Sequence, residues 1–256
     1  MAKDRRTYGI RGFFFVFLRI HRVFSAIPMY NSCAMKNLIF DADGTIWDSA
    51  QPVADSWSEV LEEKYSDRIT TRFTKEDMYA VMGRTMTEIA DVFFPGLSDE
   101  EKDAVMQDCM SHENAYLKDH PGMFYAGLVE TLKKLKEEGY HCFIVSNCQD
   151  GYLEAMLAGN KDLAECMEDI ECFGRTFLPK SGSIELLMKR NGIAKSDAVY
   201  IGDTAMDEKA ADDAGIAFIH AAYGFGAAEH PAGVIHAPEE LPRILAKLNG
   251  ENDHEA

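Results

Sequence analysis

Short apolar runs alternate with longer amphipathic stretches along most of this chain. The runs predict strands, because a few consecutive apolar residues bounded by turns are typical of a strand buried on both faces. These runs are residues 37–40, 141–145, 170–173, 198–201, 216–219 and 234–235. The stretches between them predict helices at 126–138, 150–158, 182–191 and 206–214. This alternation predicts an α/β fold, with a Rossmann-like parallel sheet and helices on both of its faces.

Residues 50–120 differ from the rest because they show almost no strand pattern. Helices are predicted near 53–64, 75–81, 85–93 and 98–118. Thr74 and Ser98 each stand three residues before an acid, which is typical of a helix start. We therefore expect a helical insertion, residues 51–120, after the first strand of the sheet. The α/β core then comprises residues 35–50 and 121–250, and residues 251–256 are a frayed tail.

The first 34 residues carry six Lys or Arg and a single acid. Their apolar run, Phe13–Leu18, is far shorter than the about 20 residues that span a bilayer, so stable membrane insertion is not expected. We expect a non-catalytic extension ahead of a domain that starts at Met35, as a misassigned start codon would produce. A basic, aromatic anchor lying on a membrane surface is the alternative.

Length, charge and cysteine content narrow the class of protein. The 256 residues suffice for one large domain or two modest ones. The net charge of −17 argues against nucleic acid or an anionic membrane surface as a partner. The six cysteines form no CxxC pair, which favours reduced core cysteines and a cytoplasmic location. We expect a monomer or a homodimer that acts on a small molecule.

Asp41 and Asp43 directly follow the first predicted strand and enter a turn at Gly44. Side chains two apart along a strand point to the same side, so these carboxylates are expected to lie close together. An EF-hand loop would need a preceding helix and a glutamate at its twelfth position, which here is Pro52. On this motif alone, a solvated turn remains an open alternative.

Further polar residues follow other predicted strands. Ser146 and Asn147 end the second strand, and Gly202–Asp207 follows a later one. Lys180 precedes the helix that leads to that later strand, with Lys189 as the alternative candidate. Ligands of open α/β sheets bind beyond the carboxyl ends of the strands. We therefore expect acids, a hydroxyl and a cation to meet at one edge of the sheet.

These motifs, taken in order, resemble those of the haloacid dehalogenase-like phosphohydrolase superfamily, over about residues 36–248. Asp41–Thr45 matches the first motif, Ser146-Asn147 the second, Lys180 the third, and Gly202–Asp207 the fourth. The stretches Ala211–Gly215 and Tyr223–Gly226 are similar to the phosphoglycolate phosphatase-like branch. The helical insertion, residues 51–120, resembles the small helical cap domain of that branch. A departure is Lys180-Ser181-Gly182, where Lys-Pro is commoner.

The resemblance implies a magnesium-dependent phosphatase that works through an aspartyl phosphate. Asp41 is then the nucleophile, and Asp43 the general acid and base. Mg²⁺ would be held by Asp41, by the backbone carbonyl of Asp43, by Asp203, and by Asp207 directly or through water. The family's dehalogenases lack the second acid, so Asp43 favours phosphate chemistry over halide chemistry.

The same resemblance assigns the phosphate-binding groups. Ser146, Asn147 and Lys180 would hold the non-bridging oxygens, and the turn that ends at Thr45 would complete the anion site. In the cap, Arg84 either pairs with a substrate carboxylate or second phosphate, or is a surface residue at a helix start. The substrate is then a small ester, phosphoglycolate-like or a sugar phosphate. The alternatives are a phosphomutase of the β-phosphoglucomutase type and a catalytically idle phosphate-binding module.

Overall fold

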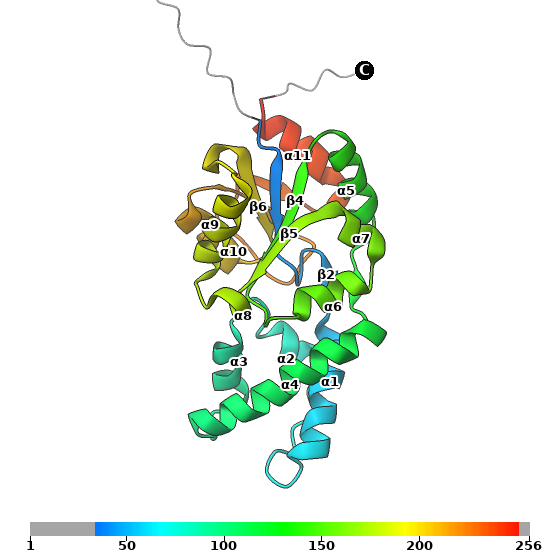
Figure 1. Ribbon diagram of the computed structural model, residues 1–256, viewed down its shortest axis with the longest axis vertical. Coiled ribbons are helices and arrows are strands. Elements are labelled where there is room, and N and C mark those ends of the chain that lie inside the picture. Colours follow the sequence, from blue (N-terminus) through cyan, green and yellow to red (C-terminus); the bar gives the residue numbers. More distant parts are fainter. Residues whose placement is uncertain (1–33, 251–256) are drawn as a thin grey trace, which may run out of the picture. The chain divides into compact units, whose positions relative to one another are not determined.

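The computed structural model describes residues 34–250, whose main feature is a six-stranded parallel sheet (Figure 1). The strand order is β5-β4-β1-β6-β7-β8. The strands are β1 (Asn37–Phe40), β4 (His141–Ser146), β5 (Met167–Cys172), β6 (Ala198–Gly202), β7 (Ala217–Ala221) and β8 (Gly233–Ile235). From β1 the chain first builds outward through β4 and β5, then returns to β6 on the other side of β1. Ligand sites of such sheets lie at this reversal point, beside the end of β1.

Both faces of the sheet are buried, as the unbroken apolar runs predict. Along β1, Leu38 and Phe40 pack into one hydrophobic cluster and Ile39 into the other. The first cluster contains residues of α5 (Leu128–Glu137), α7 (Lys161–Cys166) and α11 (Leu241–Leu248). The second contains residues of α9 (Lys180–Asn191) and α10 (Ala205–Ala214), which lie on the other side of the sheet in Figure 1. The predicted α/β class is confirmed.

Residues 50–119 form a separate group of helices, drawn in blue-green below the sheet in Figure 1. They are α1 (Ala50–Lys64), α2 (Lys75–Tyr79), α3 (Met86–Phe93) and α4 (Asp99–Asp119). The helix starts predicted at Thr74 and Ser98 are confirmed, each with a reciprocal side-chain cap, and Thr85 caps α3 in the same way. A short antiparallel ribbon, β2 (Trp47–Asp48) with β3 (Met123–Phe124), joins the two connections between this group and the sheet.

Several elements and one boundary differ from the sequence prediction. The ribbon β2–β3, helices α7 and α11 and the short helix after β5 were not predicted, and the run at 170–173 is a longer strand that begins at Met167. Phe173 belongs instead to α8 (Phe173–Thr176), and α6 covers Tyr152–Ala158. The apolar pattern missed the first half of β5 because this is an edge strand with exposed or half-buried acids at Glu168 and Asp169.

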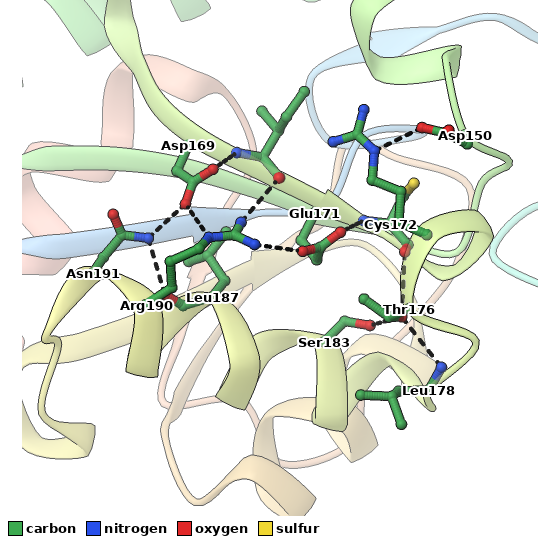
Figure 2. Close-up of polar contacts among 12 residues, drawn as sticks. Asp150, Asp169, Glu171, Cys172, Thr176, Leu178, Ser183, Leu187, Arg190 and Asn191 are labelled. Carbon is green, nitrogen blue, oxygen red and sulfur yellow. Dashed lines mark hydrogen bonds and ion pairs between the residues drawn. The ribbon is translucent and has the colours of Figure 1, made fainter.

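Asp169 and Glu171 belong to a polar network that fastens α9 to the edge of the sheet (Figure 2). The Arg190 guanidinium lies 2.7 Å from an oxygen of Asp169 and 2.7 Å from an oxygen of Glu171. Asn191 also donates to Asp169, at 2.7 Å. Glu171 is almost fully buried, so Arg190 offsets a charge that water cannot reach. The same helix, α9, begins at Lys180.

Replacing Arg190 with alanine is expected to lower the free energy of unfolding by about 1–3 kcal/mol. The buried Glu171 carboxylate would lose its cation, while the partial exposure of Arg190 keeps the loss moderate. Urea denaturation of the wild type and the variant measures this difference in the free energy of unfolding. Arg243→Ala, at an exposed arginine of α11, is the control and should change stability little. Equal stability of R190A and wild type would contradict this role.

The structure also bears on the membrane and cysteine predictions. Between residues 34 and 250, no helix combines the length and apolarity needed to cross a bilayer. The five cysteines in this part of the chain are buried and free, as predicted for reduced core residues. The predictions for Cys33, for the extension ahead of Met35 (apart from Ala34) and for the tail at 251–256 fall outside the described residues.

Candidate active site

The predicted acids meet at the carboxyl ends of β1 and β6. Asp41 directly follows β1 and Asp203 directly follows β6, and the Asp41 amide donates to the Ile201 carbonyl at 2.8 Å. Asp207 lies in the first turn of α10. One carboxylate oxygen from each of Asp41, Asp203 and Asp207 lies within 4.8 Å of the others, and all three residues are buried. The sequence prediction therefore placed these three residues together correctly.

Lys180 supplies the positive charge at this cluster. Its Nζ lies 2.9 Å from Asp41 Oδ1 and 2.6 Å from Asp207 Oδ1, and its side chain is only 4% exposed. The alternative lysine, Lys189, is exposed further along the same helix. The structure thus selects Lys180 as the cation beside Asp41.

The electrostatics of the cluster show a shortage of positive charge. Burial raises the pKa of Asp41 well above its usual range; Lys180 lowers it, and the Asp207 and Asp203 carboxylates raise it further. Burial also raises the pKa of Asp203 to about 7, with Asp207 adding to the rise. For Lys180, burial acts to lower the pKa, but the Asp207 and Asp41 carboxylates outweigh it and raise the pKa. One ammonium therefore stands against three buried carboxyl groups.

Asp203 has an oxygen free to bind a cation. Its Oδ2 accepts a hydrogen bond from the Phe225 amide at 2.7 Å, whereas Oδ1 is buried and has no partner within residues 34–250. Gly44, with φ +81°, passes so close that an added Cβ would lie 2.3 Å from Asp203 Oδ2. An unpartnered buried carboxylate oxygen among three acids fits a hard divalent cation such as Mg²⁺.

Asp207 is more constrained than the sequence suggested. Its Oδ2 caps α10, accepting from the Thr204 amide at 3.0 Å and the Thr204 hydroxyl at 2.6 Å. Its Oδ1 is the oxygen bound to Lys180. Both oxygens therefore already have partners, and Asp207 orients Lys180 as well as adding negative charge to the cluster.

Asp43 lies on the side of the site that faces the helical insertion. Its Oδ1 accepts hydrogen bonds from the Ser49 and Tyr152 hydroxyls, each at 2.6 Å. Burial raises the pKa of Asp43, and these two hydrogen bonds lower it in part. The sequence analysis missed both partners. Ser49 stands just ahead of α1, but Tyr152 comes from α6, 109 positions away, and has no motif that would mark it.

A cavity of about 50 Å³ opens beside Asp41 and Asp43, between the sheet and the insertion. Ser146 and Asn147 line it, as predicted for phosphate-binding groups. Thr45 does not line it; its side chain is fully buried behind the turn. The exposed Arg84 borders the cavity from the insertion.

The structure also shows contacts and residues around the cavity that the sequence analysis missed. Asn147 Nδ2 donates to the Gly83 carbonyl at 2.8 Å, which ties the end of β4 to the loop beside Arg84. Glu113 of α4 and Gln149 also line the cavity, and both are buried. Neither belongs to a motif, and a buried glutamate within a polar helix resembles any solvated one in sequence.

Comparison with known proteins agrees with the fold. Residues 38–221 match the sequence model of the haloacid dehalogenase-like hydrolases. A phosphoglycolate phosphatase of Pseudomonas savastanoi pv. phaseolicola is 26% identical over 224 residues, covering 82% of this chain and 78% of the relative. Pyrophosphatase PpaX of Listeria monocytogenes serotype 4a is 23% identical over 197 residues, covering 76% and 87%. The crystal structure of CbbY from Rhodobacter sphaeroides in complex with phosphate has the same fold, with a TM-score of 0.69 at 14% identity, covering 81% of this chain and 96% of CbbY.

Proposed function

Because the chain belongs to the haloacid dehalogenase-like hydrolase family, we propose that Asp41 attacks the phosphorus of a small phosphate ester and is transiently phosphorylated. The enzyme is a phosphatase. The observation that carries the mechanism is the position of Asp41, whose Oδ1 lies 2.9 Å from a buried lysine, beside two further buried acids and at the edge of a cavity. A second acid, Asp43, borders the same cavity.

We propose that the acid cluster holds Mg²⁺. Asp41 and Asp203 would be ligands, together with the backbone carbonyl of Asp43; Asp207 would act directly or through water. The support is the unpartnered Asp203 Oδ1 and the excess of carboxylates over ammonium groups. When bound, the ion supplies positive charge that offsets the repulsion between the Asp41 carboxylate and a phosphate dianion.

In the first step an Asp41 oxygen forms a bond to phosphorus while the bond from phosphorus to the ester oxygen breaks. Asp43, in its protonated form, gives its proton to the departing oxygen. The Ser49 and Tyr152 hydroxyls donate hydrogen bonds to Asp43 and hold its side chain at the cavity. The Lys180 ammonium stabilises the negative charge around Asp41.

In the second step the Asp43 carboxylate takes a proton from a water molecule, which attacks the phosphorus of phosphorylated Asp41. The bond between phosphorus and Asp41 breaks, and inorganic phosphate leaves. Ser146 and Asn147 line the cavity at this point, and the Ser146 hydroxyl and the Asn147 backbone amide would bind the non-bridging oxygens. Thr45 would act only through the backbone of its turn, since its side chain does not line the cavity.

We propose that residues 51–120 act as a cap on a core formed by residues 35–50 and 121–250. The cap would exclude bulk water during the first step and contact the leaving group. The bond from Asn147 to the Gly83 carbonyl supports this, because it links a phosphate-binding residue to the insertion. Phosphoglycolate-like compounds and sugar phosphates are the two candidate substrate classes, and the polar groups around the cavity would decide between them.

Phosphate release from p-nitrophenyl phosphate tests the function and the metal together. With Mg²⁺ we expect turnover, and removal of divalent ions by a chelator should lower it at least about 100-fold, since the ion is worth several kcal/mol in the transition state. Added Mg²⁺ should restore it. Undiminished turnover in chelator would contradict the metal proposal. No release from any of a broad panel of esters would indicate an idle module, and transfer between sugar positions with little free phosphate would indicate a mutase.

A further inference from the structure

The cavity beside Asp43 has an apolar wall contributed by the insertion and a small set of polar groups. The apolar wall consists of Val53, Met78, Val81, Met82, Met86 and Ile89. The cavity measures about 50 Å³, so a leaving group bound there lies close to the groups that line it. The few polar groups that line the cavity should therefore decide which leaving groups are accepted.

Glu113 is the acid on this wall. It is 2% exposed and lies on α4. Its Oε2 accepts from the indole nitrogen of Trp57, and its Oε1 accepts from Gln149 Nε2 at 3.0 Å. Within residues 34–250, Glu113 has no lysine, arginine or histidine in ion-pair distance. A buried carboxylate held only by neutral donors can still attract a further donor or a cation.

Gln149 and Asn147 present oxygens rather than donors. The Gln149 amide nitrogen is used by Glu113 and by Asn114 Oδ1, the latter at 3.2 Å, which leaves Oε1 buried and without a partner in the described chain. The Asn147 amide nitrogen is used by the Gly83 carbonyl, and Oδ1 is likewise buried without a partner there. Both orientations follow from those acceptors, since a flipped amide would place two oxygens together. The buried side-chain atoms that line the cavity and lack a partner in the described chain are therefore acceptors.

We infer that the leaving group carries hydrogen-bond donors, as an alcohol or amine does, and bears no carboxylate or second phosphate. This inference rests on the proposed phosphatase function. A hydroxyl or ammonium group would satisfy the unpartnered oxygens and the Glu113 carboxylate, whereas an acid would face like charge and further acceptors. The chain then differs in substrate from relatives named for phosphoglycolate and for pyrophosphate.

Arg84 is the residue that would favour an acidic leaving group instead. Its guanidinium borders the same cavity and could pair with a substrate acid. Arg84 is exposed, however, and an ion pair in water contributes little, whereas Glu113 is buried and acts at low dielectric. The two arrangements predict opposite orders of substrate preference.

A matched series of two-carbon phosphate esters distinguishes the preference set by Glu113 from the preference set by Arg84. The esters are 2-hydroxyethyl phosphate, 2-aminoethyl phosphate, ethyl phosphate and phosphoglycolate. Assays run with Mg²⁺ at about pH 8, above the pKa of about 7 to which burial raises Glu113. We expect kcat/KM for the hydroxyl and amino esters to exceed that for ethyl phosphate about 10-fold and that for phosphoglycolate about 100-fold. Phosphoglycolate turnover equal to or above that of the hydroxyl ester would overturn the inference.

Variants assign the preference to Glu113. Glu113→Gln should reduce the ratio of 2-aminoethyl phosphate to phosphoglycolate about 10-fold, because it removes the buried charge. Glu100→Gln, at an exposed position of the same helix, is the matched control and should keep the wild-type ratio.

Arg84→Ala decides between the two arrangements even if the Glu113 variant does not fold. It should leave the ratio within about 3-fold of wild type, as expected for an exposed group. A selective loss of phosphoglycolate turnover in that variant would favour the Arg84 arrangement and contradict ours. No release from any ester, p-nitrophenyl phosphate included, would contradict the proposed function and this inference with it.

Discussion

Replacing Asp41 with asparagine is expected to lower kcat for p-nitrophenyl phosphate by at least about 10⁴-fold, because the variant lacks the attacking oxygen of the carboxylate. Asparagine has nearly the same shape and leaves Lys180 paired with Asp207 at 2.6 Å, so the fold should persist. Phosphate release under saturating Mg²⁺ measures the loss. Near-normal turnover by D41N would rule out Asp41 as the nucleophile.

The same variant also tests for the covalent intermediate. Wild-type enzyme quenched in acid during turnover should carry one phosphoryl group on the peptide that contains Asp41, and D41N should carry none at any time. Asp119→Asn, at the exposed end of α4, is the matched control, and both its activity and its phosphorylation should equal those of wild type. Phosphorylation at another residue would move the nucleophile elsewhere.

Replacing Lys180 with methionine is expected to lower the free energy of unfolding by about 3–5 kcal/mol and to abolish activity. Asp41 and Asp207, with side chains 3% and 0% exposed, would lose the ammonium group that lies between them. Methionine fills a similar volume, so the loss reports charge more than packing. Urea denaturation without divalent metal measures the stability.

The stability deficit of K180M should also depend on pH. Burial already raises the pKa of Asp41 above its value in the unfolded chain, and loss of Lys180 raises it further. A carboxyl group whose pKa is higher in the folded than in the unfolded state contributes stability at low pH, and this contribution is lost as the pH rises. The stability deficit of K180M should therefore be larger at about pH 8 than at about pH 5. Lys189→Met, on the exposed side of the same helix, is the control and should change stability by less than about 0.5 kcal/mol. Equal deficits in the two variants would contradict the special role of Lys180.

The sheet and its strand-end chemistry could be predicted because they depend on local signals. Apolar runs buried on both faces, such as Asn37–Phe40 and Ala198–Gly202, differ clearly from the amphipathic helices between them. Parallel strands bring their carboxyl ends to one edge, so Asp41 and Asp203 had to lie near each other. The edge strand β5 was predicted less well, since its first half is stabilised by Arg190 rather than by apolar burial.

The wall of the cavity could not be predicted in the same way. Glu113 is one of many acids in a polar helix, and only the packing of α4 against the core buries it beside Trp57 and Gln149. Tyr152 is equally ordinary in sequence, yet its hydroxyl lies 2.6 Å from Asp43. Contacts between residues far apart along the chain carry no periodic signal.

The sequence by itself determined the fold class, the acids at the strand ends and the kind of chemistry they suit, because periodicity and motif spacing are properties of neighbouring residues. The sequence already favoured Lys180 over Lys189, but only the tertiary structure showed that both oxygens of Asp207 are already engaged and that an Asp203 oxygen is free. Only the tertiary structure, likewise, showed that Glu113 lines the cavity. The physical reason is that burial and pairing depend on which distant side chains meet, and those meetings set the charge and hydrogen-bonding capacity of the site.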